Sequence, residues 1–292
     1  MNRPDRSSQT IMVTGGTSGI GRKTARGLAE LGSSVVITGR NRARGEKVVA
    51  TIERETDGSA RFLRADFSSV TEVRRLANEF RDHADRLDVL VHNAGTFEGK
   101  RTLTETGVEK TLAVNHLAPM VLTYELVDML VEREGRIVVV SSDVHRNATL
   151  DFSDLSLSRS YSGMKAYRQS KLANVLFTYE LARRLSGTGV TANAVHPGVI
   201  PQTGLTRNSS LFARLGFNAL RLIPGVTTSE RGGAQPSIYL AVSPEVDGVT
   251  GKYFDRKKAV RSAPVTYERD TQRRLWEWSV EQAGLPETLP HN

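Results

Sequence analysis

The sequence predicts an α/β protein with a doubly wound, mainly parallel sheet of about seven strands and helices on both faces. The first observation is an alternation along the 292 residues. Short apolar runs, of the length of buried strands, are followed by longer stretches whose apolar residues recur every three or four positions. The second is a glycine-rich junction between the first run and its helix. We expect one domain over residues 10–285, with a disordered tail at 1–9 and another tail at 286–292.

Composition limits the possible functions. The net charge is +8 and the isoelectric point about 9.9, but the arginines are dispersed and no nucleic-acid motif is present, so nucleic acid is not an expected partner. The absence of cysteine excludes disulfides and thiolate metal sites, and no metal site is predicted. No apolar run is long enough for a membrane span, and the N-terminus lacks the apolar core of a signal peptide. A cytoplasmic protein is the expectation.

The first predicted strand, residues 9–14, leads into Gly15, Gly19 and Gly21. Gly15 permits a tight turn, Gly19 lets the backbone approach a pyrophosphate, and Gly21 lets helix and strand pack closely. The helix that follows, residues 20–31, would offer free N–H groups and the positive end of its dipole to the phosphates. The flanking strand and helix make this turn a dinucleotide-binding signal rather than a chance glycine cluster.

The second strand, residues 34–38, indicates which dinucleotide is bound. An acid after this strand binds the ribose hydroxyls of NAD, whereas an arginine accommodates the 2′-phosphate of NADP. The chain has Arg40 at this place and no acid before Arg42. Arg40 could simply open the next helix, residues 42–55, but after the glycine turn it favours NADP(H).

The remaining elements continue the alternation. Strands are expected at residues 60–65, 88–91, 135–142, 190–195 and 252–254, and helices at 70–81, 107–132, 166–185, 228–242 and 268–283. Pro119 stands inside the second of these helices and predicts a kink near Asn115. The strand at 135–142 ends in Ser141 and Ser142, and active groups in parallel sheets lie at the carboxyl ends of strands.

The helix at 166–185 places Lys171 one turn after Tyr167 on the same face. A phenol has a pKa of about 10, and a neighbouring ammonium is expected to lower that pKa towards the range of general acid–base catalysis. Such a pair is common by chance, and Tyr161 with Lys165 is a second match. Tyr167 and Lys171 are preferred, because no glycine separates them and a long amphipathic run follows.

Several motifs occur in a fixed order. They are T-G-x-x-x-G-x-G at 14–21, H-N-A-G at 92–95, N-H-L at 115–117, the serine-ended strand at 135–142, Y-x-x-x-K at 167–171 and P-G at 197–198. Together they resemble the short-chain dehydrogenase/reductase family over residues 10–254, with His92 in place of the family's first asparagine. The helix around Tyr167 is most similar to the retinol dehydrogenase and WW-domain oxidoreductase branch. Thr203-Gly204-Leu205 is similar to protochlorophyllide reductases, whose light-driven reaction depends on cysteine and is not expected here.

The resemblance implies a Rossmann fold and hydride transfer between NADP(H) and the carbonyl or alcohol of a small molecule. It makes Ser142 and Tyr167 the groups that hold the reacting oxygen, with Tyr167 as general acid or base. Lys171 would lower the Tyr167 pKa and anchor the nicotinamide ribose, and Asn115 would link both to solvent. The implied cofactor-binding residues are Gly15, Thr17, Ser18, Gly19, Ile20, Gly21, Arg40, Asp66, Phe67, Asn93, Ala94, Gly95, Tyr167, Lys171, Pro197, Gly198, Ile200 and Thr203. A homodimer or a homotetramer is left open.

Two further interpretations stay open. The segment at about 203–227 is expected to form a lid over a lipophilic substrate, but its basic amphipathic stretch Leu211–Ile223 could lie on a membrane instead. The same fold also serves regulatory proteins that bind a dinucleotide without catalysis. Such proteins usually lack one of the catalytic residues, and Ser142, Tyr167 and Lys171 are all present, which favours an enzyme.

Overall fold

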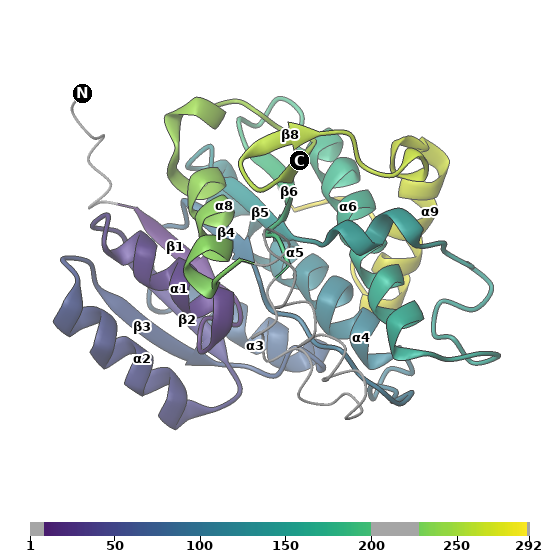
Figure 1. Cartoon of the computed structure of the whole chain (residues 1–292), viewed down its shortest axis with the longest axis horizontal. Helices are drawn as coiled ribbons and strands as arrows, with labels where there is room; N and C mark the ends of the chain where they lie inside the picture. Colours follow the sequence, from purple (N-terminus) through teal and green to yellow (C-terminus); the bar gives the residue numbers. More distant parts are fainter. Residues whose placement is uncertain (1–8, 200–227, 291–292) are drawn as a thin grey trace.

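One sheet runs through the protein, whose computed structural model describes residues 9–199 and 228–290. Within these residues the sheet has eight strands in the order β3-β2-β1-β4-β5-β6-β7-β8 (Figure 1). They are β1 (Thr10–Val13), β2 (Ser34–Gly39), β3 (Ala60–Arg64), β4 (Val89–His92), β5 (Arg136–Val140), β6 (Thr191–His196), β7 (Lys252–Asp255) and β8 (Lys258–Val260). The order reverses between β1 and β4, which is where doubly wound sheets bind ligands.

Strand pairing is parallel from β3 through β7, and β8 pairs with β7 in the antiparallel direction. The predicted fold class is therefore confirmed, but the sheet has one strand more than the seven that were predicted. The missed strand, β8, is three residues long, with its side chains mostly exposed. It follows a turn at Arg256, whose φ is +54°. Apolar periodicity does not mark such a strand, because it extends the edge of the sheet and adds little to the core.

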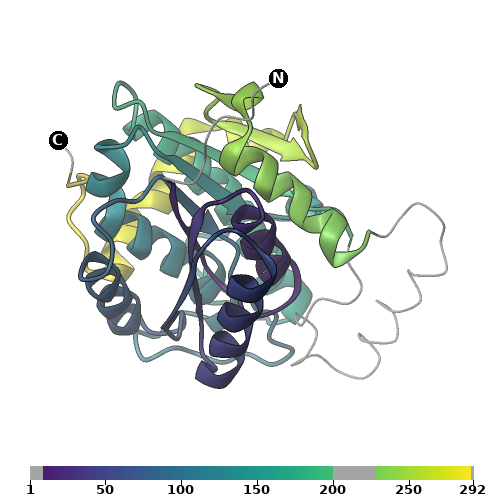
Figure 2. The same cartoon turned by 90° about the vertical axis from the view of Figure 1, so that its left-hand side faces the viewer.

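Helices cover both faces because successive residues of a strand point to opposite sides of the sheet. The helices are α1 (Gly19–Ala29), α2 (Arg42–Glu55), α3 (Val70–Arg81), α4 (Lys110–Leu112), α5 (Ala118–Val131), α6 (Gly163–Arg184), α8 (Glu230–Val242) and α9 (Arg269–Ala283). On β1, Ile11 and Val13 pack with α1, α2 and α8, whereas Met12 faces a second core formed with α3, α5 and α6. Figures 1 and 2 show α8 beside α1 on the first face, and α9 packs on the outside of α6.

Helix boundaries agree with the sequence where capping residues mark them. Helices α2 and α3 begin and end at the predicted residues, because Asn41 and Ser69 accept backbone N–H groups of the first turns. The helix predicted at 107–132 is divided into α4, a π-helical turn η1 (Ala113–Leu117) and α5. The expected kink is therefore a π-bulge, a feature that is frequent at functional sites. Helix α6 begins at Gly163, three residues before the predicted start.

Both ends of the fold extend past the predicted limits. The backbone of Gln9, which was assigned to the tail, already bonds to β2 with an N···O distance of 2.9 Å. Residues 286–290, also assigned to a tail, form a strap on α5. The Tyr124 hydroxyl of α5 donates to the Pro286 carbonyl oxygen at 2.7 Å, and Leu289 is buried. The packed chain therefore reaches residue 290.

Some predicted features lie outside the described residues. They include the lid at about 203–227 with its stretch Leu211–Ile223, the cofactor residues Ile200 and Thr203, and most of the N-terminal tail. Among the residues that are described, no helix combines the length and the apolar character needed to cross a membrane.

Candidate active site

The glycine turn after β1 has the backbone conformation that its sequence predicts. Gly15 and Gly19 have φ values of +66° and +55°, in the left-handed region that favours glycine. A Cβ on Gly21 would lie 2.3 Å from the Asn93 amide nitrogen and 2.4 Å from the Gly15 carbonyl oxygen. The absence of side chains therefore lets the start of α1 pack directly against the loops after β1 and β4.

Two side chains fasten these loops to each other. The Thr14 hydroxyl accepts hydrogen bonds from the backbone N–H groups of Asn93 and Ala94, both at 3.0 Å. The Asn93 amide donates to the Thr14 carbonyl oxygen at 2.8 Å. Asn93 thus ties the loop after β4 to the end of β1. Thr14 opens the glycine motif, but the sequence alone suggested no separate role for it.

The start of α1 fits a pyrophosphate. Ser18 precedes the helix without capping it through its side chain, which leaves N–H groups of the first turn available. A Cβ on Gly19 would meet no atom within 4 Å, so this part of the turn faces open space. Free N–H groups and the positive end of a helix dipole favour a bound phosphate. Thr17, Ser18, Gly19 and Ile20 all lie at this helix start.

Arg40 lies exposed directly after β2 and has no ion-pair partner in residues 9–199 and 228–290. Arg42, by contrast, pairs with Glu46 of its own helix at 3.6 Å. Gly39 packs on Thr17 of the glycine turn, because a Cβ there would be 2.7 Å from the Thr17 methyl group. Arg40 therefore stands beside the glycine turn with its charge available for an anionic ligand.

Asp66 follows β3 and caps the next turn, accepting hydrogen bonds from Ser68 N at 2.9 Å and Ser68 Oγ at 2.8 Å. Burial alone would raise the pKa of Asp66, but the Ser68 bonds and the charges of Arg40 and Lys110 lower it overall. The Phe67 ring is buried in the core, so only its backbone is available to a cofactor.

Asn115 lies in the π-helical turn η1 with 1% of its surface exposed. Pro119 has no N–H, so it cannot donate the α-helical bond to the Asn115 carbonyl. The Asn115 Oδ1 accepts from Thr96 N at 2.7 Å, and its Nδ2 donates to Thr96 O at 3.1 Å and to Ser170 Oγ at 2.9 Å. Ser170 Oγ donates to the Tyr167 carbonyl at 2.8 Å. Ser170, to which the sequence assigned no role, therefore connects Asn115 to α6.

The two serines after β5 make different contacts. Ser141 is buried, and its Oγ donates to the Lys171 carbonyl oxygen at 2.8 Å, which fastens the strand end to α6. Ser142 is half-buried, and its hydroxyl lies close enough to the Tyr167 phenol to lower the pKa of that phenol. The structure thus places Ser142, rather than Ser141, beside the tyrosine.

Tyr167 and Lys171 share one face of α6. The Lys171 Nζ lies 5.6 Å from the centroid of the Tyr167 ring and donates to the Val140 carbonyl oxygen at 2.9 Å. A Cβ on Gly95 would be 3.9 Å from this Nζ and 3.4 Å from the Asn115 Oδ1. The predicted catalytic residues therefore converge from η1, the end of β5 and α6 beside the loop after β4.

Burial dominates the titration of this pair. It raises the pKa of Tyr167 to about 12, and the nearby Ser142 hydroxyl offsets only part of the rise. Burial also lowers the pKa of Lys171 to about 8. The expectation that Lys171 brings the Tyr167 pKa below its usual value is contradicted for the chain by itself. At pH 7 the phenol is protonated and most of the Lys171 amine is charged.

The second Tyr–Lys match is not a helical pair. Tyr161 precedes Ser162, which caps α6, so it does not lie one helical turn from Lys165. The Tyr161 hydroxyl donates to the Glu98 carbonyl oxygen at 2.7 Å, while Lys165 is exposed. These positions leave Tyr167 and Lys171 as the acid–base candidates.

Two histidines near the site belong to the core. His92 and His116 are buried, and their Nε2 atoms lie 2.8 Å from the hydroxyls of Thr123 and Ser279. Burial lowers the pKa of each to about 3, so both rings are neutral at pH 7. Both histidines therefore serve packing in this fold.

The loop after β6 completes the described part of the site. Pro197 is buried, and Gly198 has a φ of +93°. A Cβ on Gly198 would be 3.1 Å from the Thr228 methyl group, so a side chain would crowd the start of the segment before α8. Both residues lie at the carboxyl edge of the sheet, next to the end of β5.

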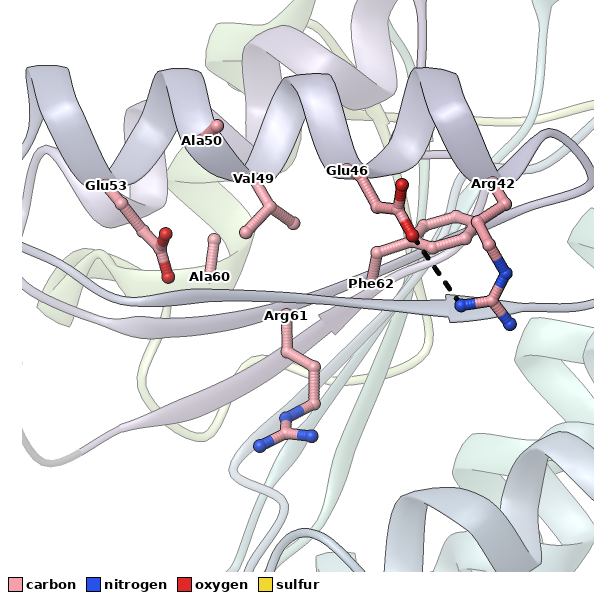
Figure 3. A pocket seen from close by; sticks show the side chains of 8 residues that line it. All are labelled: Arg42, Glu46, Val49, Ala50, Glu53, Ala60, Arg61 and Phe62. Atoms are coloured by element: carbon pink, nitrogen blue, oxygen red, sulfur yellow. Dashed lines mark ion pairs between the residues drawn. The ribbon is translucent and has the colours of Figure 1, made fainter.

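A hollow of about 390 Å³ lies elsewhere, between α2 and the edge strand β3 (Figure 3). Its lining residues are Arg42, Glu46, Val49, Ala50, Glu53, Ala60, Arg61 and Phe62. None of these was predicted as a site residue, and Figure 3 shows Arg42 turned towards Glu46 in an ion pair. This hollow is separate from the acid–base group.

A glycine turn at the reversal of strand order, with an acid–base group beside it, defines a Rossmann-type, dinucleotide-dependent oxidoreductase. A family model described as short chain dehydrogenase matches residues 9–212. The chain belongs to the short-chain dehydrogenase family, which confirms the resemblance seen in the sequence.

Curated relatives match nearly the whole chain. Retinol dehydrogenase 14 of Mus musculus is 40% identical over 291 residues, which cover 95% of this chain and 86% of the relative. The polyprenol dehydrogenase of Homo sapiens is 40% identical over 290 residues, covering 97% and 87% of the two chains.

Solved structures show the same fold. An uncharacterised protein of Mycobacterium paratuberculosis is similar with a TM-score of 0.79 and 29% identity, covering 99% of this chain and 97% of the other. The Pseudomonas aeruginosa RhlG/NADP active-site complex is similar with a TM-score of 0.70 and 25% identity, covering 87% and 97%.

Proposed function

We propose that the chain is an NADP(H)-dependent oxidoreductase that interconverts a carbonyl group and an alcohol on a lipophilic small molecule. The observation that carries the proposal is the convergence of Ser142, Tyr167, Lys171 and Asn115 beside a glycine turn suited to a pyrophosphate. Relatives named for retinol and polyprenol, both lipophilic alcohols, support the substrate class. The NADP complex of RhlG supports the type of cofactor.

In the reducing direction, the Tyr167 phenol donates its proton to the carbonyl oxygen while the Ser142 hydroxyl holds that oxygen by a hydrogen bond. Bound NADPH supplies the hydride. The Tyr167 phenol carries its proton at pH 7, as donation in this direction requires. Lys171 would bind the nicotinamide ribose through its ammonium group. Asn115 would connect Lys171 and Tyr167 to solvent through water, returning a proton to the phenol.

The cofactor assignment is tested by titrating the protein with NADPH and, separately, NADH, following energy transfer from tryptophan to the bound nicotinamide. Exposed and without an ion-pair partner among residues 9–199 and 228–290, Arg40 supports tight binding of NADPH and weak binding of NADH. Equal affinities would contradict the role of Arg40 but leave the proposed reaction in place. If neither dinucleotide binds, the dehydrogenase assignment itself fails.

The acid–base role is tested with Tyr167→Phe, using NADPH oxidation with retinal as the probe substrate. We expect turnover to fall by at least about 100-fold, the scale of general acid–base catalysis, with NADPH affinity largely unchanged. Tyr161→Phe is the matched control, because it removes a hydroxyl from the rival pair, and it should retain turnover. Near-native turnover by Tyr167→Phe would refute the assignment. NADPH binding without turnover of retinal or other lipophilic aldehydes and ketones by the unmodified protein would favour the non-catalytic regulatory alternative.

Three further features stay predictions. They are a single domain, a cytoplasmic location, and assembly as a homodimer or homotetramer. Size-exclusion chromatography with light scattering measures the last of these, and limited proteolysis tests the first.

A further inference from the structure

The backbone of Ser142 is held by a residue outside the acid–base group. His145 lies in η2 (Asp143–Asn147), a short 3₁₀ helix directly after β5, and is completely buried. Its Nδ1 lies 2.8 Å from the Ser142 carbonyl oxygen, to which its backbone N–H also donates at 3.1 Å. The ring packs on Tyr253 of β7 with a centroid separation of 4.7 Å. Within residues 9–199 and 228–290, both hydrogen bonds to this carbonyl group come from His145.

A second partner identifies the tautomer of His145. The backbone N–H of Ala263 donates to the His145 Nε2 at 3.1 Å, so this nitrogen carries a lone pair. In a neutral imidazole the proton is then on Nδ1, which makes His145 the donor to the Ser142 carbonyl. Burial lowers the pKa of His145, which favours this neutral form at pH 7.

The segment that contains Ala263 is itself bonded to α6. The neighbouring Ser262 is buried, and its Oγ lies 2.7 Å from the Tyr179 hydroxyl of α6. A continuous series of contacts thus leads from Ser142 through His145 to the helix that carries the catalytic tyrosine. The backbone of Ser142 and the helix of Tyr167 are thus linked through the fold on this side as well.

We propose that His145 is a positioning residue, which sets the backbone of Ser142 through its Nδ1–H bond and thereby aligns the Ser142 and Tyr167 hydroxyls. Ser141 already fastens β5 to α6 through its 2.8 Å bond to the Lys171 carbonyl. That bond acts one residue earlier and does not hold the Ser142 carbonyl. The side chain of His145 adds a second bond to the one that its backbone N–H makes, and together they fix the direction of this carbonyl. The inference rests on the proposed function, because it requires Ser142 to hold the substrate oxygen.

Two amide variants separate the two hydrogen bonds of the ring. In His145→Asn the amide nitrogen occupies the place of Nδ1, so the bond to Ser142 can form and the bond from Ala263 is lost. In His145→Gln the amide oxygen reaches the place of Nε2, so the bond from Ala263 can form and the donor to Ser142 is lost. We expect His145→Gln to lower kcat about 10- to 100-fold, as small misplacements of reacting groups do, and His145→Asn to lower it by less than about 5-fold.

The assay measures kcat, KM and NADPH affinity with retinal, together with the melting temperature of each variant. Both amide variants should bind NADPH like the unmodified protein. Tyr124→Phe is the control for stability, because it removes a contact of the C-terminal strap and does not contact the site. It should melt earlier without loss of kcat. Equal kcat for the two amide variants, or a kcat that follows the melting temperature in all three, would overturn the positioning role.

A readout without turnover keeps the inference separate from the proposed function. Long-range ¹H–¹⁵N correlation spectra of the full chain report which ring nitrogen of His145 carries the proton. A proton on Nδ1 is expected, and a proton on Nε2 would overturn the inference whether or not retinal is reduced. Failure of the unmodified protein to reduce retinal or bind NADPH, with the proton on Nδ1, would instead count against the proposed function.

Discussion

Replacing Lys171 by methionine should stabilise the folded protein while abolishing its activity. Lys171 is 4% exposed, and burial lowers the pKa of its ammonium group from 10.5 to about 8. At about 1.4 kcal/mol per pH unit, this difference corresponds to about 3 kcal/mol of destabilisation whenever the group is charged. Methionine removes this cost but also the bond to Val140, which contributes about 1 kcal/mol. The net gain at pH 7 is about 2 kcal/mol.

The pH dependence of this gain has a defined sign. Below pH 8 lysine is protonated in both the folded and the unfolded chain, so the full cost is present. Between about pH 8 and 10.5 the unfolded chain binds a proton that the folded chain has released, so the stability of the unmodified protein rises with pH. The advantage of Lys171→Met should therefore shrink by about 1.4 kcal/mol per pH unit, vanish at about pH 9.5 and reverse above it, where only the lost bond to Val140 remains.

The assay is urea unfolding of the cofactor-free protein, followed by tryptophan fluorescence at pH 7 and pH 9.5. Lys165→Met is the matched control, since Lys165 lies exposed in the same helix and its replacement should change stability by less than about 0.5 kcal/mol. An unchanged m-value would show that the difference lies in stability alone. If Lys171→Met is less stable than the unmodified protein at pH 7, the ammonium group is not penalised by burial and the reasoning fails.

Three other substitutions test the cofactor site and the core. Arg40→Ser should weaken NADPH binding by about 10- to 100-fold, the value of one or two charged hydrogen bonds, and leave NADH binding unchanged in the same titration. Gly21→Ala places a Cβ 2.3 Å from the Asn93 amide nitrogen. It should lower the free energy of unfolding, measured in urea, by about 1–3 kcal/mol and weaken the binding of NADPH and NADH together. Trp276→Ala removes a ring that is 2% exposed and stacked on Phe177. It should lower the free energy of unfolding by about 3–5 kcal/mol. A variant as stable as the unmodified protein would contradict the packing of α9 on α6.

Much of the fold could be predicted because strong local signals agree with the final packing. Helices α2 and α3 have capping residues and apolar periods that act within a few positions, and their predicted ends hold. The strand β8 and the strap at 286–290 have no such signal. Both segments are too short to show a period. Strand β8 is held by its pairing with β7, and the strap is held by the Tyr124 side chain, far from it in the sequence. Local periodicity carries no information about such contacts.

The residues of the candidate site could be predicted where a sequence motif determines how the side chains lie relative to one another. Tyr167 and Lys171 were preferred over the second pair partly because Gly163 weakens a helix, yet Gly163 is the first residue of α6. A Cβ there would lie 2.5 Å from the Glu98 carbonyl oxygen, so the glycine serves packing between the helix and the loop after β4. The pKa of Tyr167 could not be anticipated from helical spacing, because burial depends on the whole fold.

The position of Ala263 near the end of the chain affects the timing of biosynthesis. The segment that binds His145, and the helix α9 that covers α6, both lie in the last thirty residues of the described chain. Because a chain emerges from the ribosome starting with its N-terminus, the glycine turn and the catalytic helix leave the exit tunnel before these parts. A nascent chain could therefore form its dinucleotide cradle early, while the alignment of Ser142 with Tyr167 waits until residue 263 and the helix after it have been released.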